Sequence, residues 1–94
     1  FYYLTDKYLF VHAGINPDYP LEEQDEVDLV YIRGKFIYSK HKLPQKIIFG
    51  HTEFDEPYID EGKICIDLGC GKYPDAHLCA LILNEDGTRE FVYS

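Results

Sequence analysis

Two short, mainly apolar runs constrain the fold of this chain most strongly. Tyr8–Val11 and Lys46–Phe49 are each followed within two residues by a histidine, His12 and His51, with a glycine close by. Runs of this kind are typical of strands that are buried on both faces of a sheet. We therefore expect two buried strands, each with its histidine at the point where the strand enters a loop.

The two histidines are candidate ligands of a metal ion. If the two strands are neighbours, both imidazoles lie on one rim of the sheet, and neutral imidazole is the commonest nitrogen ligand of transition metals. The alternative is that each ring caps its strand end by bonding to the backbone. A tight site usually has three or four protein ligands. His12 and His51 would therefore form only part of one.

The segment between the two strands predicts one main helix over residues 25–38. Its Leu29, Ile32, Arg33 and Phe36 recur at spacings of three and four, so they share one face. An arginine on such a face indicates a bound anion, because guanidinium binds phosphate through two parallel hydrogen bonds. The alternative for Arg33 is a surface side chain that pairs with one of the nearby acids.

The second half of the chain predicts short strands joined by turns. Turn residues at 60–62 and 84–87 separate apolar segments, which favours hairpins over residues 58–66 and 77–93. We therefore expect a single α+β domain with about six short strands and one main helix. We also expect the Asp67 side chain to bond the amides of the glycine-containing loop that follows it.

The charge and the cysteine content argue against several classes of protein. The 94 residues carry a net charge of -8, which disfavours binding to nucleic acid or to an anionic membrane. No apolar run approaches the roughly 18 residues of a membrane-spanning helix. Cys65, Cys70 and Cys79 have no close zinc spacing, and their odd number is ordinary for a reducing compartment. We expect a cytoplasmic protein without a disulfide scaffold, in which the two cysteines of apolar strand segments, Cys65 and Cys79, pack in the interior.

Four segments, in order, resemble one known family. They are similar to the C-terminal half of the bacterial PPP-type metallophosphatases of the calcineurin-like phosphoesterase superfamily. These enzymes include serine/threonine protein phosphatases and diadenosine tetraphosphate hydrolases. The resemblance covers nearly the whole chain and rests on Phe10-Val11-His12-Ala13-Gly14-Ile15, Leu29-Val30-Tyr31-Ile32-Arg33, Ile48-Phe49-Gly50-His51-Thr52 and Ile64-Cys65-Ile66-Asp67-Leu68-Gly69-Cys70. This chain has Tyr31 where the family usually has tryptophan, and Leu68 where it has threonine.

The resemblance implies a fold and a site. Residues 1–94 would be a single C-terminal portion of a metallophosphoesterase domain, a β-sandwich flanked by helices. The intact enzyme would hold two divalent metal ions (manganese, iron or zinc), one of them bound by His12 and His51. Arg33 would be the catalytic residue that binds the substrate phosphate. The family's motifs for the other metal ligands, GDxHG, GDxxDRG and GNHE, do not occur in the 94 residues, so we expect these residues alone to be inactive.

The expected function is hydrolysis of phosphoric esters. The favoured enzyme is a serine/threonine protein phosphatase, in which a water molecule activated by two metal ions attacks the phosphate. The expected partners are a phosphorylated protein or nucleotide, together with a missing N-terminal half or a second copy of this chain. One alternative is a dinucleoside polyphosphate hydrolase. Another is a non-catalytic interaction or assembly module.

Overall fold

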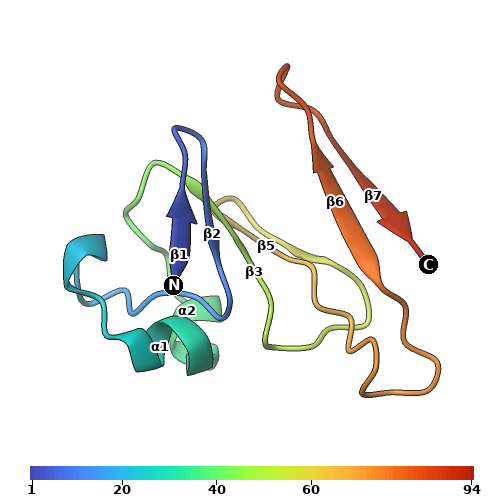
Figure 1. Ribbon diagram of the computed structural model, residues 1–94. Coiled ribbons are helices and arrows are strands. Elements are labelled where there is room, and N and C mark those ends of the chain that lie inside the picture. The colour runs from blue at the N-terminus through green and yellow to red at the C-terminus, as the bar shows by residue number, and fades with distance from the viewer.

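The computed structural model describes all residues, 1–94, and contains two sheets and two short α-helices (Figure 1). The larger sheet has five strands in the order β1-β2-β3-β5-β4, and the smaller sheet pairs β6 with β7. The expected α+β class is confirmed. The elements are β1 (Tyr2–Leu4), β2 (Tyr8–Val11), the 3₁₀ turn η1 (Leu21–Glu23), α1 (Glu26–Tyr31), α2 (Gly34–Ile37), β3 (Lys46–Phe49), β4 (Tyr58–Ile59), β5 (Lys63–Cys65), β6 (Cys79–Leu83) and β7 (Arg89–Tyr93).

Three parallel strands form the centre of the larger sheet. Phe10 of β2 is in register with Ile48 of β3, and Phe49 of β3 is in register with Cys65 of β5. The outer strands β1 and β4 pair with this centre in the antiparallel direction. The predicted strand bounds for β2 and β3 are confirmed. Because β2, β3 and β5 are parallel, their carboxyl ends meet at one edge of the sheet.

One face of the larger sheet packs against the two helices. Leu9 and Val11 of β2 and Ile47 of β3 belong to the same buried cluster as residues of α1 and α2. Phe36 of α2 is fully buried, and its ring meets that of Phe49 edge-on with centroids 4.9 Å apart. The smaller sheet stands on the other side of the larger one in Figure 1.

Gly14 has no room for a side chain. Its φ is +147°, and a Cβ atom at this position would lie 2.3 Å from Cδ2 of Phe36. A larger residue would have to displace a fully buried aromatic ring. The glycine therefore lets the loop after β2 pass directly over the core.

The prediction of one continuous helix over residues 25–38 is wrong. The chain forms α1, becomes extended at Ile32, and restarts as α2 after Arg33, whose φ and ψ are -132° and -109°. With the break, Ile32, Phe36 and Ile37 enter the core while Arg33 between them stays exposed. Arg33 is exposed rather than directed inward, and Gly34 lowers the helical preference at the break.

A buried lysine joins α2 to the sheet. The side chain of Lys63 is 3% exposed, and its ammonium donates hydrogen bonds to the carbonyls of Ile37, at 2.9 Å, and Ser39. It also pairs with Asp60 at 3.3 Å and lies 5.3 Å from the centre of the Phe36 ring. A cation at a helix C-terminus satisfies carbonyls that have no partner within the helix.

The remaining elements agree with the predicted hairpins, with one addition. The predicted hairpins are confirmed as β4–β5 and β6–β7. The edge strand β1 was not predicted, because all three of its residues are exposed and show no alternation of buried and exposed positions. No helix has the length and apolarity needed to span a bilayer. The three cysteines are free thiols, with Cys65 and Cys79 buried as expected and Cys70 exposed.

Candidate metal and phosphate site

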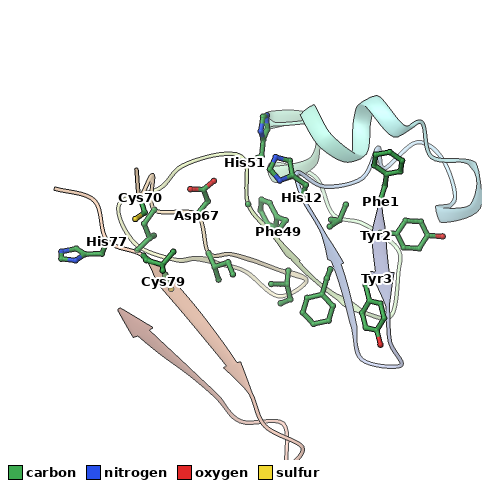
Figure 2. Close-up of a pocket in the computed structure, with 17 residues that line it drawn as sticks. Phe1, Tyr2, Tyr3, His12, Phe49, His51, Asp67, Cys70, His77 and Cys79 are labelled. Atoms are coloured by element: carbon green, nitrogen blue, oxygen red, sulfur yellow. The ribbon is translucent and has the colours of Figure 1, made fainter. Parts of the chain in front are cut away.

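The sheet brings the two predicted histidines together. His12 directly follows β2, and His51 lies one residue beyond the end of β3, so both leave adjacent parallel strands at the same edge. Their ring centroids are 5.2 Å apart, with 54° between the ring planes. The amide of Gly50 donates a hydrogen bond of 2.8 Å to the carbonyl of His12, which fixes one strand end against the other. Figure 2 shows both rings at the same end of the pocket.

His51 is held in an unusual backbone conformation. Its φ of +68° makes it the only residue other than glycine with a positive φ. The amide of Thr52 bonds to the carbonyl of Gly50 at 2.8 Å, which closes a tight turn around His51. A non-glycine residue in this region costs on the order of 1–3 kcal/mol and persists only where its surroundings impose it. The turn places the imidazole of His51 beside that of His12.

Tyr31 adds a third ring to this group. It is the last residue of α1, and its ring meets the imidazole of His51 edge-on, with centroids 6.0 Å apart and 83° between planes. The side chain is otherwise largely exposed. The aromatic ring of Tyr31 therefore packs beside the His51 imidazole.

Arg33 lies close enough to influence His51 electrostatically. The pKa of His51 is lowered, first by burial and next by the positive charges of Arg33 and His12, while Glu53 and Asp67 act in the opposite direction. The neutral imidazole, the form that can bind a metal ion, is therefore favoured. Arg33 takes part in none of the ion pairs of the protein, although 17 acidic residues are present. The alternative considered for Arg33, a surface side chain that pairs with a nearby acid, is met only in its exposure, because no such pair is formed.

Glu53 and Lys72 connect the site to the loop after β5. Their side chains form an ion pair of 2.9 Å, and the hydrogen bond from Lys72 is the main cause of the lowered pKa of Glu53. In the sequence Glu53 is one of several acids between His51 and Gly62, and nothing in its spacing indicates Lys72 as its partner. Only the fold shows that the two loops meet next to the histidines.

Asp67 lies at the edge where the histidines meet. Its Oδ1 accepts a hydrogen bond of 2.9 Å from the amide of Gly69, as predicted. Its carbonyl accepts another from the amide of Phe54. Asp67 follows β5, the third parallel strand, and it lines the same pocket of about 670 Å³ as His12 and His51. Figure 2 shows this carboxylate and the two imidazoles around that pocket.

The donor set fits part of a metal site. Two neighbouring imidazoles, one with a lowered pKa, are suitable nitrogen ligands for manganese, iron or zinc. No group of three or more histidine, cysteine, aspartate or glutamate side chains is placed to hold a metal ion. A complete coordination shell would need ligands from another polypeptide segment, or water.

Comparisons with protein-family models, with curated proteins and with solved structures gave no match to this chain.

Proposed function

We propose that the chain forms part of a metal-dependent phosphoric ester hydrolase, a serine/threonine protein phosphatase of the bacterial PPP type. The observation that carries the proposal is the pair of imidazoles 5.2 Å apart at the carboxyl edge of two parallel strands. Four sequence segments in the order of that family support it. The two sheets would correspond to the C-terminal part of a β-sandwich.

In this proposal His12 and His51 supply two ligands to one of two divalent metal ions. When bound, the ions would supply Lewis-acid chemistry and a water molecule of lowered pKa. The strained turn at His51 and the hydrogen bond between Gly50 and His12 preset the two ligands, so little rearrangement is needed on binding. The remaining ligands come from a partner segment, and residues 1–94 alone are inactive.

Arg33 binds the phosphate group of the substrate. The guanidinium is exposed, forms no ion pair within the protein, and lies close enough to His51 to lower its pKa. A guanidinium presents two parallel N–H donors to phosphoryl oxygens and stabilises the charge on them during transfer. The substrate is a phosphorylated protein, or a nucleotide in the dinucleoside polyphosphate hydrolase alternative.

Paramagnetic broadening by Mn²⁺ tests the metal assignment. In amide NMR spectra of the chain, substoichiometric Mn²⁺ should broaden the signals of Ala13 and Thr52 before those of the acidic residues 22–26. His12→Ala and His51→Ala should each abolish the selective broadening. His77→Ala, which removes an exposed histidine bonded to the Ser94 carbonyl, should leave it unchanged. Broadening confined to the acidic stretches would contradict the proposal.

A further inference from the structure

A second cleft lies at the opposite end of the larger sheet from the histidines. It has a volume of about 900 Å³ and lies between the β1–β2 turn, the connector 39–46 and the β4–β5 turn. Lys7 and Lys46 line it near the amino ends of β2 and β3, whereas His12 and His51 follow the carboxyl ends. Roughly 13 Å of strand separates the two sites, at about 3.3 Å per residue. The upper end of the sheet in Figure 1 is this amino end.

The cleft is lined by lysines that form no ion pair. Lys7, Lys40 and Lys46 line it, and none of them forms an ion pair. Lys42 lies in the same connector and is also unpaired. The protein has nine lysines and arginines against 17 acids, and Lys7 is within electrostatic reach of Asp86. The lining itself, with Lys7, Lys40, Lys46 and Lys63 against Asp60 and Glu61, nevertheless reverses the overall charge. Such a concentration raises the local concentration of anions.

The acids of the cleft do not neutralise these lysines. Asp60 is already bound, because it accepts hydrogen bonds from the amide of Gly62, from the Tyr58 hydroxyl and from the buried Lys63. Glu61 is the other acid that lines the cleft, and it is exposed at the turn. The lining therefore keeps an excess of positive charge.

The frame of the cleft is tied together by hydrogen bonds. A ring nitrogen of His41, Nε2, lies 2.8 Å from the carbonyl of Gly62, and its Nδ1 accepts a hydrogen bond from the amide of Leu43 at 3.2 Å. The amide of Lys46 donates to the carbonyl of Lys7 at 3.0 Å. These bonds fix the connector to both neighbouring turns, so the lysine backbones are positioned in advance. Preorganisation of this kind lowers the entropy cost of binding.

We infer that this cleft is a docking site for an acidic peptide segment of a partner protein. The lysines come from separate segments around a largely polar cleft, so the successive carboxylates of an acidic peptide can pair with several of them. The protein as a whole, with its net charge of -8, repels an acidic peptide. Binding therefore depends on the lysines of the cleft. The site is independent of the proposed phosphatase chemistry at the other end of the sheet.

Fluorescence anisotropy with a labelled hexaglutamate peptide tests this site. At about 20 mM salt the chain should bind hexaglutamate and not hexaglutamine, and the affinity should fall as salt rises. Lys40→Gln and Lys46→Gln should each weaken binding about fivefold, in the range of single exposed ion pairs. Lys35→Gln is the matched control, because it removes one positive charge from α2, where Lys35 pairs with Asp18 at 2.7 Å. It should change the affinity less than twofold.

Three results would overturn the inference. One is the absence of binding to hexaglutamate at low salt by a chain whose circular dichroism shows it folded. Another is equal weakening by Lys35→Gln and Lys46→Gln, which would reflect total charge only. The third is concentration-dependent self-association that Lys46→Gln abolishes while hexaglutamate does not bind. In that case the occupant would be the exposed acidic stretch 22–26 of a second copy.

Discussion

The imidazoles of His12 and His51 stand 5.2 Å apart because β2 and β3 are adjacent, parallel and in register. The two histidines are far apart in the sequence, and no local segment connects them. Their contact is produced by the sheet, and it is reinforced by the hydrogen bond from the Gly50 amide to the His12 carbonyl. A pair of nitrogen donors at a strand edge is thus a direct consequence of the two apolar runs.

Replacing Gly14 should strongly destabilise the protein. In Gly14→Ala the new Cβ would meet the Phe36 ring at 2.3 Å, in addition to the strain at φ +147°. We expect the free energy of unfolding in urea to fall by at least about 2 kcal/mol. Gly71→Ala is the control, since Gly71 also has a positive φ but nothing lies within 4 Å of its Cβ position. Equal losses from both variants would show that the contact with Phe36 is unimportant.

Removing the ammonium of Lys63 should lower the free energy of unfolding more than removing that of Lys72. Lys63→Met leaves the buried Ile37 carbonyl without its donor and removes one of the three donors to Asp60, which should lower the free energy of unfolding by about 3 kcal/mol. Lys72→Met breaks an ion pair in which the lysine is 58% exposed, and should cost less than about 1 kcal/mol. Thermal and urea unfolding of the two variants measure the difference. If Lys63→Met left the free energy of unfolding unchanged, the Ile37 carbonyl and the Asp60 carboxylate would have to find other hydrogen-bond donors.

The thiol of Cys65 should be inert while the protein is folded. Burial raises the pKa of Cys65 from 9.0 to about 11, so little thiolate forms at pH 8. Iodoacetamide should then modify the exposed Cys70 and leave Cys65 and Cys79 unmodified until urea is added. Peptide mass spectrometry locates the adducts. Rapid labelling of Cys65 without denaturant would contradict its burial.

The same shift predicts a loss of stability at alkaline pH. In the unfolded chain the Cys65 thiol ionises near pH 9, whereas in the folded protein it stays protonated up to about pH 11. The contribution of the protonated Cys65 thiol to the free energy of unfolding is complete below pH 9 and declines as the pH rises toward 11. The free energy of unfolding of Cys65→Ala should fall less steeply between pH 9 and 11 than that of the unaltered protein. If the free energy of unfolding fell equally steeply with pH in both proteins, the raised pKa of Cys65 would be refuted.

Arg33 should depress the pKa of His51. Burial, Arg33 and His12 together lower this pKa, so an NMR titration should show His51 protonating below the ordinary value of about 6.5. Because the unfolded chain binds this proton at higher pH, stability should fall as the pH drops below about 6.5. Arg33→Gln should raise the pKa of His51, and Lys35→Gln should not. An unchanged titration in Arg33→Gln would place the guanidinium outside the reach of His51.

The sequence predicted the strands well because their burial is visible locally. The expected burial on both faces holds for β3, whereas in β2 buried residues alternate with half-buried ones, Tyr8 and Phe10; the turns at 60–62 and 84–87 delimit both hairpins. The break at Arg33 could not be seen, because it depends on burying Ile32, Phe36 and Ile37 together against the sheet. A periodic stripe alone favours an unbroken helix.

The parts of the site that the sequence missed depend on contacts between distant segments. Glu53 and Lys72 meet only because the loops after β3 and β5 leave the same edge of the sheet. Lys63 looks like an ordinary strand residue, and its burial depends on the end of α2 lying above it. His12, His51 and Arg33 were found because their residue types are unusual for their positions.

A crystal of the chain soaked in Zn²⁺, with anomalous difference maps, tests the central proposal most directly. We expect a peak between the rings of His12 and His51, about 2.0–2.1 Å from one nitrogen of each. The peak should be absent from His51→Ala crystals soaked under the same conditions. Strong peaks only at acidic surface residues, with the two imidazoles unliganded, would contradict the assignment of these histidines as metal ligands.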